Sequence, residues 1–128
     1  MRGRWQQSVG GAYACDVPDA APLLTAVEPA ADRLRTLPES ALRRGAAAEG
    51  LALARELAVR AQRLEFPQSA PLELPDVGVF AVGDQLLVAA HDLAEILRDV
   101  DGDHELADAV SLVQLATVRI AEAATGKR

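Results

Sequence analysis

The sequence predicts an all-α protein, most simply a four-helix antiparallel bundle with a proline-rich connector between its second and third helices. Apolar residues recur at alternating steps of three and four along four segments, which is the spacing of a helix buried along one side. Proline or an Asp-Gly pair interrupts the chain between these segments. Half of the 128 residues are hydrophobic but only 3% are aromatic, so the core must be built from aliphatic side chains.

The first helix is expected over residues 19–36, where Asp19 can cap its amino terminus. Its apolar stripe comprises Leu23, Val27, Ala30, Leu34 and Leu37. Pro29 lies inside this pattern. Because proline cannot donate the hydrogen bond that a helix interior needs, we expect a kink or a fresh helix start there.

The second helix is expected over residues 38–64, with Pro38 in the first turn, where proline is tolerated. Its stripe comprises Leu42, Ala46, Gly50, Leu53, Leu57, Ala61 and Leu64. Gly45 and Gly50 each cost about 1 kcal/mol relative to alanine in a helix interior. We therefore expect a neighbouring helix to approach this one closely at the two glycines, and the alternative is a functional hinge or a ligand groove there.

Residues 65–75 contain three prolines and should form an extended connector rather than a helix. The apolar residues expected to hold it against the bundle are Phe66, Leu72 and Leu74. The third helix is expected over residues 76–100, because its apolar period continues without a break. That stripe comprises Val79, Val82, Leu86, Ala90, Leu93, Leu97 and Val100. The alternative is a short strand over residues 77–82, with Asp84 as the N-cap of a later helix.

The fourth helix is expected over residues 104–124, after the turn at Asp101-Gly102. Its inward residues are expected to be Leu106, Val110, Val113, Thr117 and Ile120. Gly126 follows the last apolar position and is suited to end the helix.

Two groups of charged residues flank the turns after the first and third helices. The basic cluster comprises Arg33, Arg35, Arg43 and Arg44, and the acidic cluster comprises Asp99, Asp101 and Asp103. An up-down-up-down order of helices would bring the clusters together, and their attraction favours that order, although exposed pairs contribute only about 0–1 kcal/mol each. A connector that crosses over would place them at opposite ends and leave the acidic end as a docking surface. Both clusters are therefore candidate partner surfaces.

His91 and Glu95 are four residues apart and should share one face of the third helix, with Asp84 near the same line. A histidine with carboxylates can bind a divalent metal or act as an acid–base pair. Metal-binding bundles use Glu-x-x-His on two helices, whereas the order here is His-x-x-x-Glu and occurs once. The metal hypothesis therefore requires a carboxylate from the second helix, either Glu49 or Glu56.

Arg98 and His104 are separated by five residues around the turn between the third and fourth helices. This pair resembles the Arg-x(4–6)-His motif of HEPN-type ribonucleases, which are also four-helix bundles. The resemblance covers only this motif and the fold class. It would imply that His104 is the acid–base group and that Arg98 holds a phosphate. The acidic residues around the motif would repel RNA.

Composition bears on compartment and partners. The formal net charge of −6 does not favour nucleic acid as a partner. Cys15 is the single cysteine, so no internal disulfide points to an oxidising compartment. Residues 1–18 match no periodic pattern and are expected to be a disordered tail before one domain over residues 19–128. No apolar run suits a signal peptide or a membrane span, which predicts a cytoplasmic protein without membrane contact.

These observations favour a small non-catalytic bundle that acts through protein–protein contacts, either with another protein or as a homodimer. No nucleophile–base pair, phosphate loop or complete metal-ligand set is legible in the sequence, so we expect no cofactor. Two alternatives stay open. One is a HEPN-like ribonuclease that uses Arg98 and His104, and the other is a metal- or ligand-binding bundle that uses His91 and Glu95 with Asp84.

Overall fold

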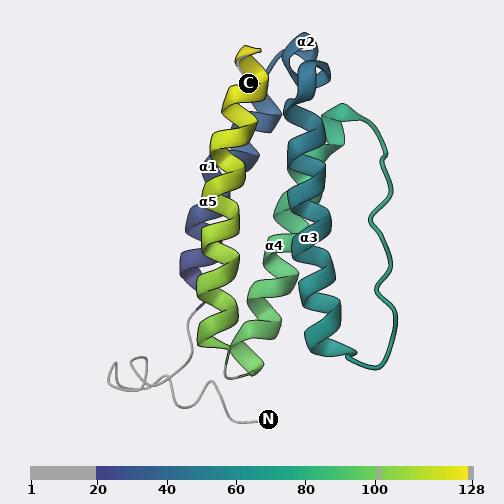
Figure 1. Ribbon diagram of the computed structural model, residues 1–128, viewed down its shortest axis with the longest axis vertical. Coiled ribbons are helices and arrows are strands. Elements are labelled where there is room, and N and C mark those ends of the chain that lie inside the picture. The colour runs from purple at the N-terminus through teal and green to yellow at the C-terminus, as the bar shows by residue number, and fades with distance from the viewer. Residues whose placement is uncertain (1–19, 101, 127–128) are drawn as a thin grey trace.

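The computed structural model describes residues 20–100 and 102–126, and the tail expected over residues 1–18 lies outside this range (Figure 1). The described chain forms a bundle of four long helices without strands, which confirms the predicted fold class. The long helices are α1 (Ala21–Thr36), α3 (Ala47–Glu65), α4 (Val82–Asp99) and α5 (Asp103–Thr125). The short elements are α2 (Glu39–Ala41), the π-helical turn η3 (Leu42–Ala46) and the 3₁₀ turn η4 (Val79–Ala81).

The helices follow the crossover order rather than the up-down-up-down order. α1 and α5 run in one direction, and α3 and α4 run together in the opposite direction (Figure 1). Each helix packs against two neighbours, so that α1 lies diagonally across from α3, and α4 lies diagonally across from α5. Residues 66–78 return along the outside of the bundle from the end of α3 to the start of α4. An extended segment of that length reaches about 43 Å, which exceeds the roughly 28 Å length of α3.

The connector is fixed to α3 mainly by polar contacts. Gln62 donates a hydrogen bond to the carbonyl of Leu72 (3.0 Å) and accepts one from its N–H (2.7 Å). Arg55 Nε donates to the carbonyl of Leu74 (2.8 Å). Of the expected apolar anchors, only Leu74 packs against the core, whereas Phe66 and Leu72 are exposed. The sequence expectation was wrong for these two side chains because the main chain of the connector, not its apolar side chains, makes the attachment.

The first half of the chain builds the core as expected, with two local differences. The stripe of the first helix is buried from Leu23 to Leu34, whereas Leu37 lies just after α1 and is partly buried. α1 continues through Pro29 without restarting. Gly50 lies where α3 meets its neighbours, since a Cβ there would lie 2.7 Å from Leu34 Cδ1 and 2.9 Å from Val82 Cγ1. Gly45 has another role, because its φ of 143° breaks the expected second helix at η3.

The third helix starts later than expected. The chain is extended through residue 78 and turns through η4, so α4 begins at Val82 rather than at Asp76. Gly78 has a φ of 108°, a backbone conformation that a helix cannot contain, and Asp76 Oδ1 accepts a hydrogen bond from its N–H (3.0 Å). The strand considered for residues 77–82 does not form either. No helix in the described ranges has the length and apolar character needed to cross a membrane.

Candidate functional site

The residues of the metal hypothesis lie along α4 but do not assemble. Asp84, His91 and Glu95 are all exposed, and Asp84 is paired with α1 through Arg35, whose Nε lies 3.2 Å from Asp84 Oδ1. The hydrogen bond that Arg35 donates to Asp84 raises the pKa of Arg35 above its ordinary value. Glu56 is paired with Arg60 of its own helix (3.0 Å). Across residues 20–100 and 102–126, no three His, Cys, Asp or Glu side chains are grouped closely enough to hold a metal ion.

Arg98 and His104 lie on either side of the turn that joins α4 to α5. Arg98 is in the last turn of α4, His104 is in the first turn of α5, and both are exposed. The side chain of His104 is 84% exposed and its Nε2 lies 3.4 Å from Asp108 Oδ2, one turn further along α5. The pair is therefore set on open surface at the end of the bundle that also carries Asp99 and Asp103.

The basic cluster lies at the opposite end of the bundle from Asp99 and Asp103 of the acidic cluster, because the connector crosses over. Three of the four arginines are engaged within the fold. Arg35 bonds Asp84, Arg43 bonds Glu39 (2.6 Å), and Arg44 donates to the carbonyl of Ala124 at the end of α5. Arg33 is exposed. In the acidic cluster Asp99 and Asp103 are exposed, whereas Asp101 lies outside the described residues.

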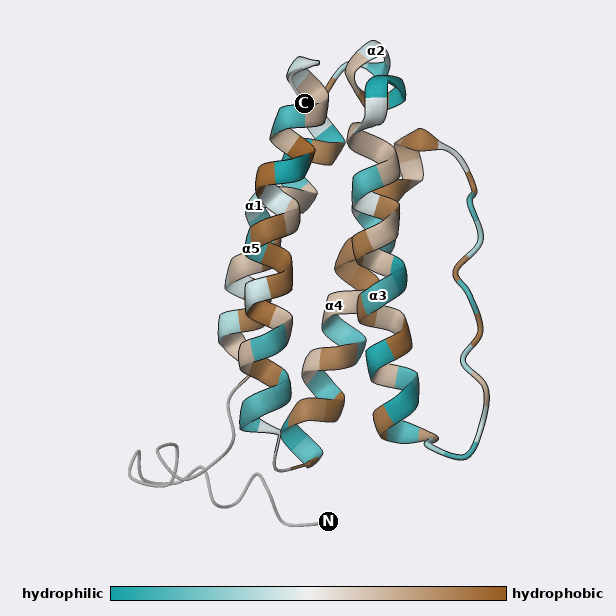
Figure 2. Cartoon of the chain, viewed as in Figure 1, coloured by the Kyte–Doolittle hydropathy of each residue, from teal (hydrophilic) through white to brown (hydrophobic). Residues whose placement is uncertain are grey.

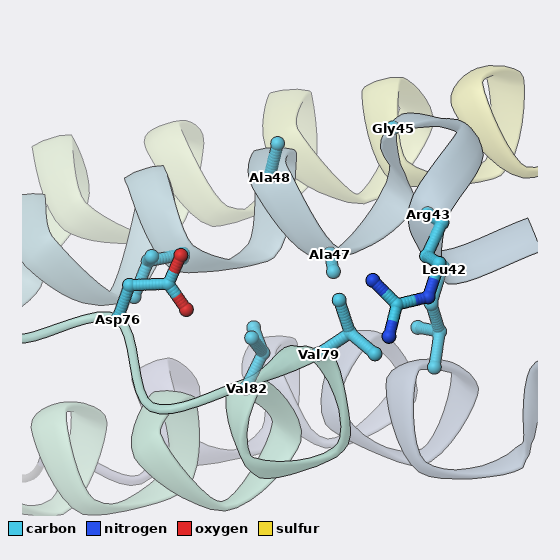
Figure 3. Close-up of a pocket in the computed structure, with 9 residues that line it drawn as sticks. Leu42, Arg43, Gly45, Ala47, Ala48, Asp76, Val79 and Val82 are labelled. Atoms are coloured by element: carbon cyan, nitrogen blue, oxygen red, sulfur yellow. The ribbon is translucent and has the colours of Figure 1, made fainter. Parts of the chain in front are cut away.

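A shallow pocket of about 230 Å³ opens between η3, the start of α3 and η4. Figure 3 shows the Arg43 guanidinium and the Asp76 carboxylate at opposite ends of this pocket, with Val79 and Val82 between them. Small-molecule sites usually enclose about 300–1,000 Å³ and bury most of their ligand. Arg43 is already bonded to Glu39, and Asp76 to the main chain of its own turn, so the pocket offers few free polar groups.

The outer side of α5 carries the feature that sequence reasoning missed. Leu115 and Val118 are 51% and 54% exposed and lie one helical turn apart. Ala107 and Ser111 continue the same exposed stripe toward the start of the helix. We call these four residues the outer face of α5. Residues 109–118 contain no charged side chain, so the middle of this face is uncharged over more than two turns.

The residues on the inward side of α5 explain why the sequence did not predict this face. The buried residues are Ala109, Val113, Ala116, Ile120, Ala123 and Ala124. The other expected inward residues, Leu106, Val110 and Thr117, are only partly buried at the edge of the core. α5 therefore buries mostly alanines and keeps larger apolar side chains outside, and Figure 2 shows hydrophobic colouring recurring along it. Residue spacing could have indicated the outer face of α5, because Leu115 and Val118 do not fit the inward stripe.

Other exposed apolar residues of the helices lack such a setting. Val88 on α4 is 61% exposed, but Asp84, His91 and Asp92 surround it on the same helix, and all three are exposed. Single apolar residues among charged ones are normal on protein surfaces. The outer face of α5 differs because Leu115 and Val118 are adjacent and residues 109–118 carry no charge. The charges nearest to them are Arg119, one turn beyond Leu115, and Glu122, one turn beyond Val118.

No family model, curated protein or solved structure matches this chain.

Proposed function

We propose that this protein is a non-catalytic helical bundle that acts through protein–protein contacts made by the outer face of α5. The observation that carries the proposal is the uncharged stretch of residues 109–118, with Leu115 and Val118 about half exposed on one face. A cytoplasmic location is part of the proposal, because the single cysteine permits no internal disulfide.

The chemistry of this face suits a protein surface better than a small ligand or nucleic acid. The cores of protein interfaces are depleted of charged residues and rich in apolar area, and a polar rim surrounds them. The outer face of α5 has this pattern, with Asp108 and Arg119 at its ends and Gln114 beside it. A convex helix surface cannot enclose a small molecule, and an uncharged face on a protein of net charge −6 offers nothing to a phosphate backbone.

Site-specific photo-crosslinking in the organism that encodes the protein tests the proposal. A benzophenone amino acid is placed at position 118, and a matched control is placed at position 88 on α4. The two valines are exposed to similar extents, 54% and 61%, but α4 lies diagonally across from α5. We expect a crosslinked protein adduct from position 118 and none from position 88.

A second variant confirms that the adduct reports this face. Leu115→Glu, combined with the crosslinker at position 118, should reduce the adduct at least about tenfold, because an interface would bury the new carboxylate without a partner. Circular dichroism checks that the variant stays folded, which is expected for a half-exposed site. Equal crosslinking from positions 118 and 88, or an adduct insensitive to Leu115→Glu, contradicts the proposal.

A further inference from the structure

The proposed function leaves open which protein covers the outer face of α5, and the charges at the ends of that face indicate the partner. We propose that the partner is a second copy of this chain, packed with its α5 antiparallel to the first about a two-fold axis beside residues 113 and 114. This inference rests on the proposed function, because it uses the same face.

Two charge pairs on α5 share one centre. Asp108 and Arg119 are eleven residues apart, close to three full turns, so they lie on the same side of the helix. Their midpoint falls between Val113 and Gln114. His104 and Glu122 are eighteen residues apart, or five full turns, and their midpoint is Val113.

In an antiparallel two-fold pairing, this spacing brings residues of opposite charge together. Such an axis keeps each flank of the helix on the same side of the interface and exchanges positions at equal distances from the centre. Asp108 of one copy then lies opposite Arg119 of the other, and His104 lies opposite Glu122. A parallel pairing would instead bring each of these residues to the same level along the helices as its own copy, so it would not bring Asp108 and Arg119, or His104 and Glu122, together.

The uncharged middle of the face fits the same centre. Ser111 and Leu115 also have Val113 as their midpoint, so the large side chain of each Leu115 would lie over the small Ser111 of the other copy. Ala107 and Val118 are related in the same way to within one residue. Large side chains packed over small ones are what close antiparallel helix contacts require.

Charge reversal at Asp108 and Arg119 tests the register in the full-length chain. Sedimentation equilibrium of the unaltered protein should give twice the 13.5 kDa mass of the chain. Asp108→Arg and Arg119→Asp should each raise the dimer dissociation constant about tenfold or more, because each places like charges together twice. The double variant should restore the constant to within about threefold. The control is Asp92→Arg, an exposed reversal on α4, which should leave the constant unchanged.

A cysteine test gives an independent readout, and it covers the case in which Asp108→Arg fails to fold beside Arg60 and Arg63, which line a shallow pocket with it. In a Cys15→Ser background, Gln114→Cys should form an intermolecular disulfide on oxidation, because position 114 lies beside the axis. Glu122→Cys should not, because the two copies of that position would lie about 26 Å apart along the helices. A parallel dimer would allow both disulfides.

The outcomes separate this inference from the proposed function. A strict monomer up to millimolar concentration overturns the homodimer, and if position 118 still crosslinks to another protein in cells, the proposed function stands alone. A dimer in which the double reversal is no tighter than the single reversals, together with disulfides at both cysteine positions, overturns the antiparallel register. A dimer with no adduct from position 118 defeats both proposals.

Discussion

Replacing Gly50 by alanine tests how closely α3 packs against its neighbours. The added Cβ would lie 2.7 Å from Leu34 Cδ1 and 2.9 Å from Val82 Cγ1, and both side chains are almost fully buried, at 2% exposure. Overpacking of this kind costs about 1–3 kcal/mol. The better helix propensity of alanine returns about 1 kcal/mol. Gly50→Ala should therefore lower the free energy of unfolding by up to about 2 kcal/mol.

Urea denaturation measures this change, with the slope of the transition unchanged if the native state stays compact. Ala52→Gly is the matched control, because Ala52 is exposed in the interior of the same helix and reports propensity alone. We expect it to lose about 1 kcal/mol. A Leu34→Ala background removes the nearer obstruction and leaves Val82 Cγ1, so Gly50→Ala should destabilise the protein less there than in the unaltered chain. If Gly50→Ala stabilises the unaltered chain by as much as Ala52→Gly destabilises it, the close approach is refuted.

Two further predictions concern hydrogen bonds from side chains to the main chain, first between α3 and the connector and then at the end of α5. Gln62→Ala removes both hydrogen bonds to the main chain of Leu72, so amide exchange measured by mass spectrometry should become faster across the connector, whereas Gln68→Ala in the exposed connector should leave it unchanged. Arg44→Ala removes a donor to a carbonyl in the last turn of α5 and should lower the free energy of unfolding, measured in urea, by about 1 kcal/mol. Arg33→Ala should change it by less than about 0.5 kcal/mol, because Arg33 is exposed. Equal effects of the two substitutions would contradict a stabilising role for the Arg44 hydrogen bond.

The helices and most of the core could be predicted because a helix that is buried along one side has apolar residues at periodic positions in the sequence. The stripes from Leu23 to Leu34 and from Leu42 to Ala61 appear in the structure almost unchanged. The start of α4 could not be predicted from that period. Apolar residues continue through Val79, but the positive φ of Gly78 and the hydrogen bond that its N–H donates to Asp76 end the extended segment there instead. Local backbone conformation overrode the apolar spacing at this point.

The sequence pattern gives less information about the order of the helices. The charge pattern favoured an up-down-up-down order, but exposed pairs contribute too little to decide between topologies. The crossover is held instead by hydrogen bonds from Arg55 and Gln62 to the main chain of the connector, and by one from Gln85 Nε2 to the carbonyl of Pro75 (2.9 Å). Contacts between side chains and main chain have no periodic signature, so the sequence alone could not reveal them.

The candidate site shows the same contrast between features that residue spacing predicts and features that depend on packing. The sequence correctly placed His91 and Glu95 on one helix, but how far they lie from carboxylates on α3 depends on the packing of the bundle. The outer face of α5 was missed because Leu115 and Val118 are ordinary residues in an apolar helix. Only the packed bundle shows that alanines fill the inner side of α5 and that these larger side chains point outward.

Hydroxyl-radical footprinting in intact cells tests most directly whether a protein covers α5. Val118 and Val88 are the same residue type with similar exposure in the single chain, 54% and 61%, so their intrinsic reactivities match. Coverage of α5 predicts that Val118 is oxidised several-fold less than Val88 in cells, and that the two are oxidised equally once the protein is denatured. Equal oxidation of Val118 and Val88 in cells would contradict the proposal that this protein acts through the outer face of α5.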